Sequence, residues 1–221
     1  MSPDTLAWPG ILLLGAWHGI NPGMGWLFAV ALGMQDRNGR AVWRALPPLA
    51  LGHAIAIAST ALLAAAAGRV LPDWLLAWAV AGTLVTLGVV RLVSSRHPRY
   101  GGMRVNQREL TIWSALMATA HGAGLMVVPL LLPGGIAVEA AGHTAHMAGV
   151  ASTPVIETAL VATLVHTAGY LLVAGLLAWL VYRHVGVAVL RRWWVNLDLT
   201  WAMALIVTGL LTLTPHLAPG P

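Results

Sequence analysis

The stretch GAWHGINPGM, residues 15–24, places a histidine, a proline and three glycines inside a long apolar run. A second stretch, HGAGLM at residues 121–126, repeats the His-Gly pair in the other half of the chain. An ionisable ring is costly in hydrocarbon, so within a membrane helix it usually faces a cavity or a partner and marks function. We therefore take His18 and His121 as the first candidate site residues of a chain built from membrane helices.

The composition supports that starting point. The chain is 58% hydrophobic and 9% charged, whereas an average soluble domain is about 25% charged. Several apolar stretches approach the roughly 20 residues that cross a bilayer as a helix. The sequence therefore predicts an all-α integral membrane protein with the lipid bilayer as its main partner.

Cysteine usage and charge placement exclude two other classes. The chain has no cysteine, which excludes disulfides and thiolate-bound metals. Its formal net charge is +5, but the arginines are divided among short loops rather than gathered in one basic segment. That distribution favours membrane topology over nucleic-acid binding.

The apolar runs predict a polytopic bundle of six transmembrane helices. Their expected ranges are Trp8–Met34, Pro48–Ala67, Trp74–Val93, Leu110–Leu132, Pro154–Val181 and Leu197–Leu213.

The charges of the loops predict how the helices are oriented. Arginines follow the first, third and fifth helices, and the opposite loops hold only Arg69. The positive-inside rule then places both termini on the non-cytoplasmic side of the cell (inner) membrane. Three helices per half in opposite orientations make a 3+3 inverted repeat, with residues 1–95 and 96–221 as the two halves of one membrane domain.

Breaks are expected in the first and fourth helices. Proline removes a backbone donor, so we expect the first helix to break at Asn21-Pro22. In the fourth helix, Gly122 and Gly124 lower helix stability and Pro129 is expected to interrupt it. Discontinuous helices at equivalent places in two halves are typical of a transporter's midplane site. The alternative is that these residues only allow close helix packing.

Four histidines, His18, His53, His121 and His166, are expected to line one polar cavity. Imidazole is a common ligand for transition metals, and three nearby residues are candidates to complete a coordination sphere or cargo pathway: Asn21, Met24 and Met126. The alternative for any one histidine is a hydrogen bond between helices. The same cavity also suits an organic or inorganic anion, held by half-helix N-termini.

Other polar residues lie outside this set. His143 and His146 are three residues apart and follow Glu139, so they form either a shallow metal-capture site or an ordinary solvated loop. Glu157, at the start of the fifth helix, is either a favourable charge at the helix dipole or a proton-coupling group. Arg91 is expected to extend to the lipid headgroups.

The His18-Gly19…Pro22-Gly23 segment, its partner His121-Gly122-Ala123-Gly124 and the three-plus-three layout resemble the lysine-exporter superfamily of small transporters. The nickel/cobalt efflux branch looks nearest, because it also places histidine in its first motif helix. That branch carries acidic residues and a second histidine shortly after the first, where this chain has Asn21-Pro22-Gly23. The resemblance implies a six-helix transporter.

The leading hypothesis is a transporter that moves a transition-metal ion by alternating access around the four histidines. A haem-binding electron-transfer subunit is an alternative, because two histidines on neighbouring helices can supply both axial ligands. Export of a small organic solute or anion is a third. We expect no enzyme, because no serine–histidine or paired-carboxylate arrangement is evident. The expected protein partner is a second copy of the chain or another subunit.

Overall fold

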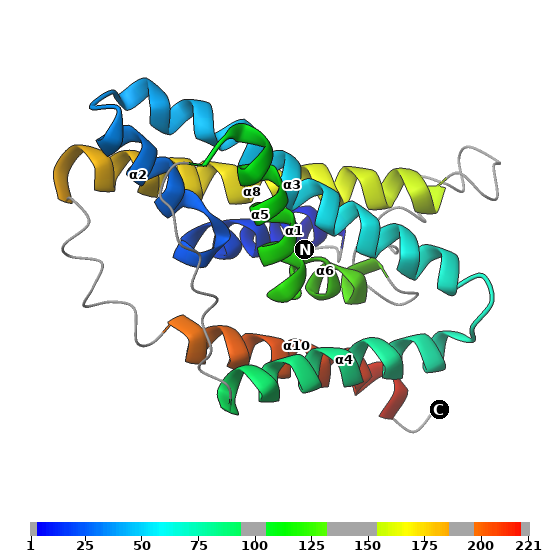
Figure 1. The fold of residues 1–221 in the computed structure, drawn as a ribbon. Helices are drawn as coiled ribbons and strands as arrows, with labels where there is room; N and C mark the ends of the chain where they lie inside the picture. The colour runs from blue at the N-terminus through cyan, green and yellow to red at the C-terminus, as the bar shows by residue number, and fades with distance from the viewer. Residues whose placement is uncertain (1–3, 94–104, 132–153, 186–196, 218–221) are drawn as a thin grey trace.

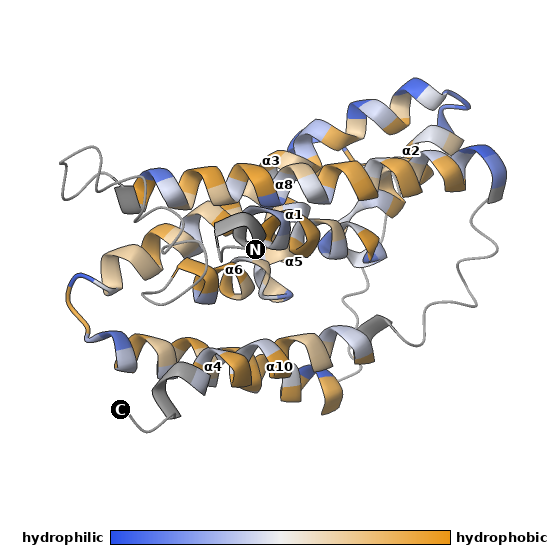
Figure 2. Cartoon of the chain, turned by 180° about the vertical axis from the view of Figure 1, so that it is seen from behind, coloured by the Kyte–Doolittle hydropathy of each residue, from blue (hydrophilic) through white to orange (hydrophobic). Residues whose placement is uncertain are grey.

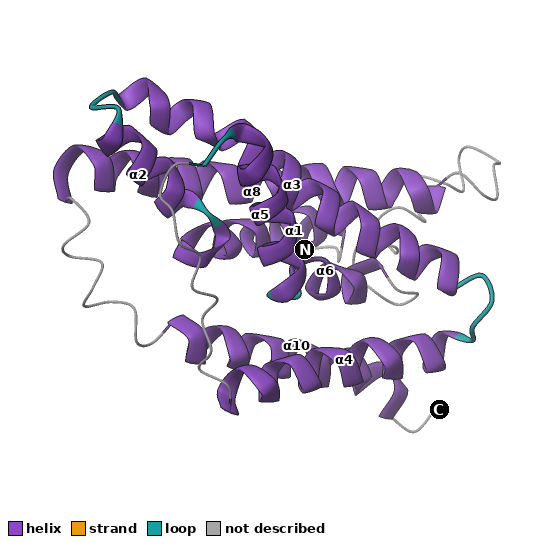
Figure 3. Ribbon diagram, in the orientation of Figure 1, coloured by secondary structure: helices purple, strands orange, loops and turns teal. Residues whose placement is uncertain are grey.

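The computed structural model describes residues 4–93, 105–131, 154–185 and 197–217, and all regular structure in these ranges is helical (Figure 3). The all-α prediction is confirmed for this part of the chain. Three helical stretches are long and apolar enough to cross a bilayer: Gly39–Ala67, Asp73–Val93 and Ile156–His184. A fourth results if Gln107–Ala120 and Ala123–Leu131 are taken as one bent span. By length and composition, the described residues thus contain three or four candidate spans.

The first predicted helix is broken at Asn21-Pro22, as the sequence predicts. Helix α1 (Asp4–Ile20) ends before Asn21, a short 3-10 turn η1 (Pro22–Met24) follows, and α2 (Trp26–Gln35) continues the chain. A residue that precedes proline is disfavoured in helical conformation, and Asn21 is extended, with φ −69° and ψ 118°. Its side-chain oxygen accepts a hydrogen bond from the Gly23 backbone N–H at 2.9 Å.

The second helix begins earlier than predicted. Helix α3 spans Gly39–Ala67, and the side chain of Asn38 caps it by accepting from the Arg40 backbone N–H at 3.0 Å. Pro47 and Pro48 lie inside α3, so the predicted start at Pro48 is wrong. The helix start is set by the Asn38 cap instead. Helix α4 (Asp73–Val93) matches the third predicted helix.

The fourth predicted helix is divided at Gly122 rather than at Pro129. Helix α5 (Gln107–Ala120) and helix α6 (Ala123–Leu131) meet at an angle of 58°. Gly122 has φ +71°, a conformation that only glycine adopts without a steric cost. Pro129 lies within α6, so the prediction that it interrupts the helix is wrong.

The last two helices match their predicted ranges closely. Helix α8 spans Pro154–Leu180 and continues into one π-helical turn, η2 (Val181–Val185). Helix α10 spans Leu197–Leu217.

The helices pack in pairs drawn from different halves of the chain (Figure 1). Helix α1 packs along α8, and α3 packs on α5 and on α8. Helices α4 and α10 lie side by side and form one edge of the structure (Figure 1). The site described below lies among α1, α3, α8 and the two breaks.

Large apolar side chains cover the outside of the long helices. Leu63 is 71% exposed, Leu164 68% and Leu172 73%. Figure 2 shows hydrophobic residues along the lengths of the helices and hydrophilic residues mainly near their ends. Exposed apolar patches of this extent mark a surface that meets lipid or protein rather than water, which supports a membrane protein.

Candidate functional site

His18 and His121 have the same local geometry at the two breaks. His18 lies in the last turn of α1, and its Nδ1 is 2.8 Å from the carbonyl oxygen of Leu14. His121 is the first residue after α5, and its Nδ1 is 2.8 Å from the carbonyl oxygen of Met117. A carbonyl oxygen only accepts, so Nδ1 carries the proton in both rings and Nε2 holds the lone pair. At the first break, Nε2 of His18 has no hydrogen-bond partner.

Close helix contacts bring the other two histidines toward the breaks. Gly15 faces the backbone carbonyl of His166 so closely that a Cβ there would overlap it. Gly52, next to His53, lies in the same way against the Thr111 carbonyl of α5. Small residues let membrane helices approach each other's backbones. These two glycines therefore determine how far α8 and α3 bring their histidines inward.

Three of the four predicted histidines form one cluster, which we call the imidazole triad: His18, His53 and His166. The ring centroids are 4.8 Å apart for His18 and His166, 5.5 Å for His53 and His166, and 5.8 Å for His18 and His53. All three side chains are completely buried. The triad joins α1, α3 and α8 at the level of the first break.

Five ring nitrogens of the triad have no hydrogen-bond partner. They are Nε2 of His18 and both ring nitrogens of His53 and of His166. A buried polar atom without a partner costs about 1–3 kcal/mol, and such groups are rare enough in proteins to need an explanation. Binding of a ligand that accepts from or donates to these nitrogens would supply one.

Two aromatic residues that the sequence analysis missed enclose the triad. The Tyr170 ring stacks on His53, with centroids 4.1 Å apart and planes 16° apart. The edge of Trp201 meets the His18 ring at 4.6 Å, with planes 85° apart. Tyr170 follows His166 by one helical turn and so shares its face of α8, a signal the sequence did contain. Nothing in the sequence singles out Trp201.

The fourth histidine lies beside the triad, at the junction of the two breaks. The His121 ring is 5.8 Å from the Trp201 ring. A Cβ placed on Gly23 would lie 3.7 Å from Nε2 of His121. The break in the first half thus contacts the histidine of the break in the second half.

Two of the other predicted site residues have local structural roles. Asn21 uses its side-chain oxygen in the turn at Gly23, and the backbone carbonyl of Met24 accepts from the Tyr170 hydroxyl at 2.8 Å. Met24 and Met126 are buried in the same apolar core as Tyr170 and Trp201. Asn21 and Met24 thus lie in the first break, on the side of His18 and Tyr170.

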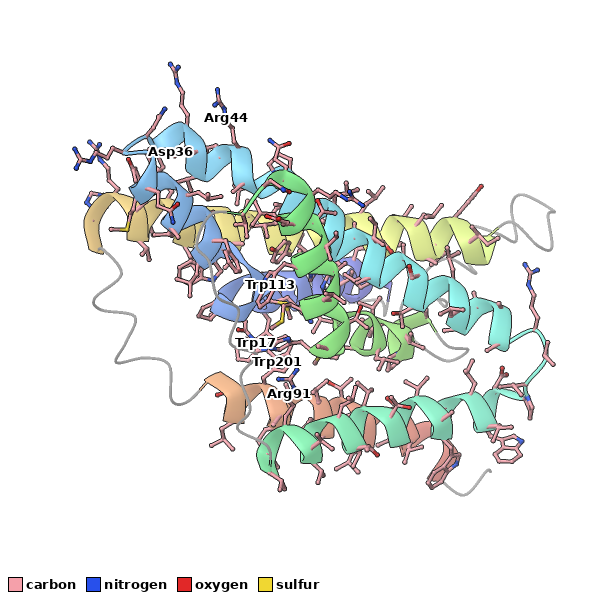
Figure 4. All side chains as sticks on the ribbon, in the orientation of Figure 1. Trp17, Asp36, Arg44, Arg91, Trp113 and Trp201 are labelled. Atoms are coloured by element: carbon pink, nitrogen blue, oxygen red, sulfur yellow. The ribbon has the colours of Figure 1, made fainter. Side chains whose placement is uncertain are left out.

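The remaining predicted residues lie away from the triad. Glu157 is exposed in the first turn of α8, and nine residues of helix separate it from His166 by about 13 Å. His143 and His146 lie outside the described residues. Arg91 does not simply extend to headgroups, because its Nη2 donates to the Ala120 carbonyl at 3.0 Å. Figure 4 shows Arg91 close to Trp201 at the α4–α10 edge.

Within the described ranges, no group of three or more histidine, aspartate or glutamate side chains is arranged to hold a metal ion. In the triad, the stacking of the rings prevents such an arrangement. The planes of His53 and His166 are 14° apart, and one face of His53 is covered by Tyr170. Coordination by all three rings would therefore require at least one of them to turn.

Comparison with protein-family models, with curated proteins and with solved structures finds no match to this chain.

Proposed function

We propose that this protein is a membrane transporter that carries a divalent transition-metal ion through the imidazole triad. The observation that carries the proposal is the burial of five unpartnered ring nitrogens from three helices at the level of a helix break. Broken backbone at membrane depth is tolerated where it is enclosed by protein or lines a cavity, and it is a common feature of transporter binding sites.

The separations of the three ring centroids, though not their present orientations, match those of imidazoles around one ion. Imidazoles that bind a tetrahedral ion at about 2.0–2.1 Å place their ring centres about 5 Å apart, and the three observed separations lie between 4.8 and 5.8 Å. His53 can turn about its side-chain bonds without losing a hydrogen bond, because its ring makes none. Turning His53 does cost its stacking contact with Tyr170.

The transport cycle we propose uses six spans in a 3+3 inverted repeat, with both termini on the non-cytoplasmic side of the cell membrane. Helix pairing supports this arrangement, because α1 packs on α8 of the other half and α5 packs on α3 of the first. A two-fold relation between residues 1–95 and 96–221 would exchange these two pairs. His18 and His121, which have matching hydrogen bonds, would then be equivalent positions in alternating access.

A second candidate, proton-coupled movement of a small solute or anion, is favoured by one observation. The rings of His53, His166 and Tyr170 are nearly parallel, which suits an enclosed aromatic and hydrogen-bonding site better than a ready-made metal site. In that function the histidines would carry protons. For the haem alternative, no described contact adds support, and the visible absorption spectrum of the purified protein tests it directly.

The proposal is tested by flux of Co²⁺, Ni²⁺ and Zn²⁺ into liposomes that contain the purified protein. We expect His18→Ala, His53→Ala and His166→Ala to abolish the flux of at least one of these ions. His184→Ala is the matched control, because His184 is exposed in η2 and far along the chain from the triad. Absence of flux of all three ions in the wild type would reject metal transport, and undiminished flux in the three triad variants would reject passage of the ion through the triad.

A further inference from the structure

Helices α4 and α10 form a unit that packs mainly on itself. Gly88 of α4 lies against α10, where a Cβ would be 2.6 Å from Ile206 and 2.8 Å from the Ala202 carbonyl. Gly209 of α10 lies as closely on Ala81 of α4. Toward the other helices, this pair is in contact mainly with α6 (Figure 1). The α4–α10 pair is therefore joined to the rest of the structure near the α5–α6 break.

Two side chains of that pair donate to consecutive carbonyls at the break. Arg91 of α4 donates from Nη2 to the Ala120 carbonyl at 3.0 Å. Trp201 of α10 donates from Nε1 to the His121 carbonyl at 2.9 Å. The last carbonyls of a helix have no helical donors of their own, so these two bonds stabilise the broken backbone of α5 from outside.

The same indole contacts the histidines of both breaks. Trp201 is 3% exposed, and its ring meets His18 at 4.6 Å and His121 at 5.8 Å, both edge to face. One buried side chain from α10 thus contacts the His18 ring, the His121 ring and the His121 backbone.

We infer that Trp201 is a positioning residue of the histidine site. Its hydrogen bond to the His121 carbonyl and its contact with the His18 ring fix the positions of the two break histidines relative to each other. This inference rests on the proposed transport function and adds to it a residue from α10, a helix that contributes no histidine to the site. A displacement of the α4–α10 pair would be transmitted to His18 and His121 through Trp201, with Arg91 moving the neighbouring carbonyl.

The test compares Trp201→Phe with the wild type in Co²⁺ flux. Phenylalanine keeps an aromatic ring beside His18 but has no N–H to donate. We expect KM for Co²⁺ to rise about five-fold, the equivalent of one lost buried hydrogen bond, with little change in kcat. Trp78→Phe is the control, because Trp78 lies on the exposed face of α4. If Trp201 were merely structural, Trp201→Phe would lower the amount of active protein and leave KM unchanged, and that result would overturn the inference.

A second readout needs no metal and separates this inference from the proposed function. Diethyl pyrocarbonate modifies unprotonated imidazole, and peptide mass spectrometry reports its rate at each histidine. We expect Trp201→Phe to speed modification of His121 several-fold, and Trp78→Phe to leave it unchanged. If the wild type carries no Co²⁺, the transport proposal fails and this rate decides the inference: faster modification of His121 supports it, and an unchanged rate overturns it.

Discussion

The hydroxyl of Tyr170 donates a 2.8 Å hydrogen bond to the backbone carbonyl of Met24. The two residues are 146 positions apart in the sequence. Met24 is the last residue of the 3-10 turn in the first break, and the same Tyr170 ring stacks on His53. One side chain of α8 therefore connects the broken backbone with the imidazole triad.

Removal of that hydroxyl gives the first prediction. Tyr170→Phe keeps the ring on His53 and leaves the buried Met24 carbonyl without this donor, which costs about 1–3 kcal/mol. We expect a lower Tm in detergent for Tyr170→Phe. Tyr182→Phe, at a half-buried position in η2, is the comparison, and equal Tm values for the two variants would contradict this role of Tyr170.

The close contact of α1 with α8 gives the second prediction. A Cβ at Gly15 would overlap the His166 carbonyl, so Gly15→Ala must separate the helices and displace His166. We expect a destabilisation of about 1–3 kcal/mol together with loss of metal flux. Gly82→Ala is the matched control on α4, because a Cβ there meets nothing within 4 Å and alanine favours a helix. The prediction fails if Gly15→Ala is as stable as Gly82→Ala in thermal unfolding.

Conformational freedom at the second break gives the third prediction. Gly122 has φ +71°, which costs a residue with a side chain about 1–2 kcal/mol, and a Cβ there would lie 3.0 Å from Leu205. We expect Gly122→Ala to lower stability and metal flux. Gly124→Ala is the comparison, because its Cβ would clash with Thr60 but its backbone has no positive φ. Hydrogen exchange of the α5 and α6 amides should report greater opening around residue 122 in Gly122→Ala, and unchanged exchange would contradict a requirement for glycine.

Proton competition gives the fourth prediction. Metal binds neutral imidazole, so protonation and metal binding exclude each other. Acidification adds protons to the ring nitrogens and must therefore weaken metal binding. We expect Co²⁺ flux, measured at equal pH on both sides, to fall once the pH is low enough to protonate the triad. A flux that rises on acidification would instead favour proton-coupled movement of another solute.

The sequence predicted the parts of the fold that depend on local signals. The break at Asn21-Pro22 follows from proline and the residue before it, and the helix ranges follow from apolar runs. The second break was placed at Pro129, because a proline is a stronger local signal than a glycine. In the structure, Pro129 is accommodated in α6 and Gly122 supplies the turn. The start of α3 was also misplaced, since the helix begins after the Asn38 cap and accommodates Pro47 and Pro48.

The arrangement of the candidate site depends more than the helix ranges do on packing between helices that are distant in the sequence. Histidine placement in the helices led us to expect one shared cavity, and three of the rings do meet. The contact of His121 with Trp201 and Gly23, rather than with the centre of the triad, depends on how α10 and η1 meet the α5–α6 break. Local sequence patterns carry no information on that contact. The same holds for Arg91, whose partner is a backbone carbonyl 29 residues away.

Metal binding by the triad is tested most directly by X-ray absorption at the metal edge of purified protein loaded with one equivalent of Zn²⁺ or Co²⁺. We expect one tightly bound ion with three imidazole nitrogens at about 2.0–2.1 Å, reduced to two in His53→Ala and unchanged in His184→Ala. A protein that retains no ion, or an ion surrounded by oxygen alone, would contradict it.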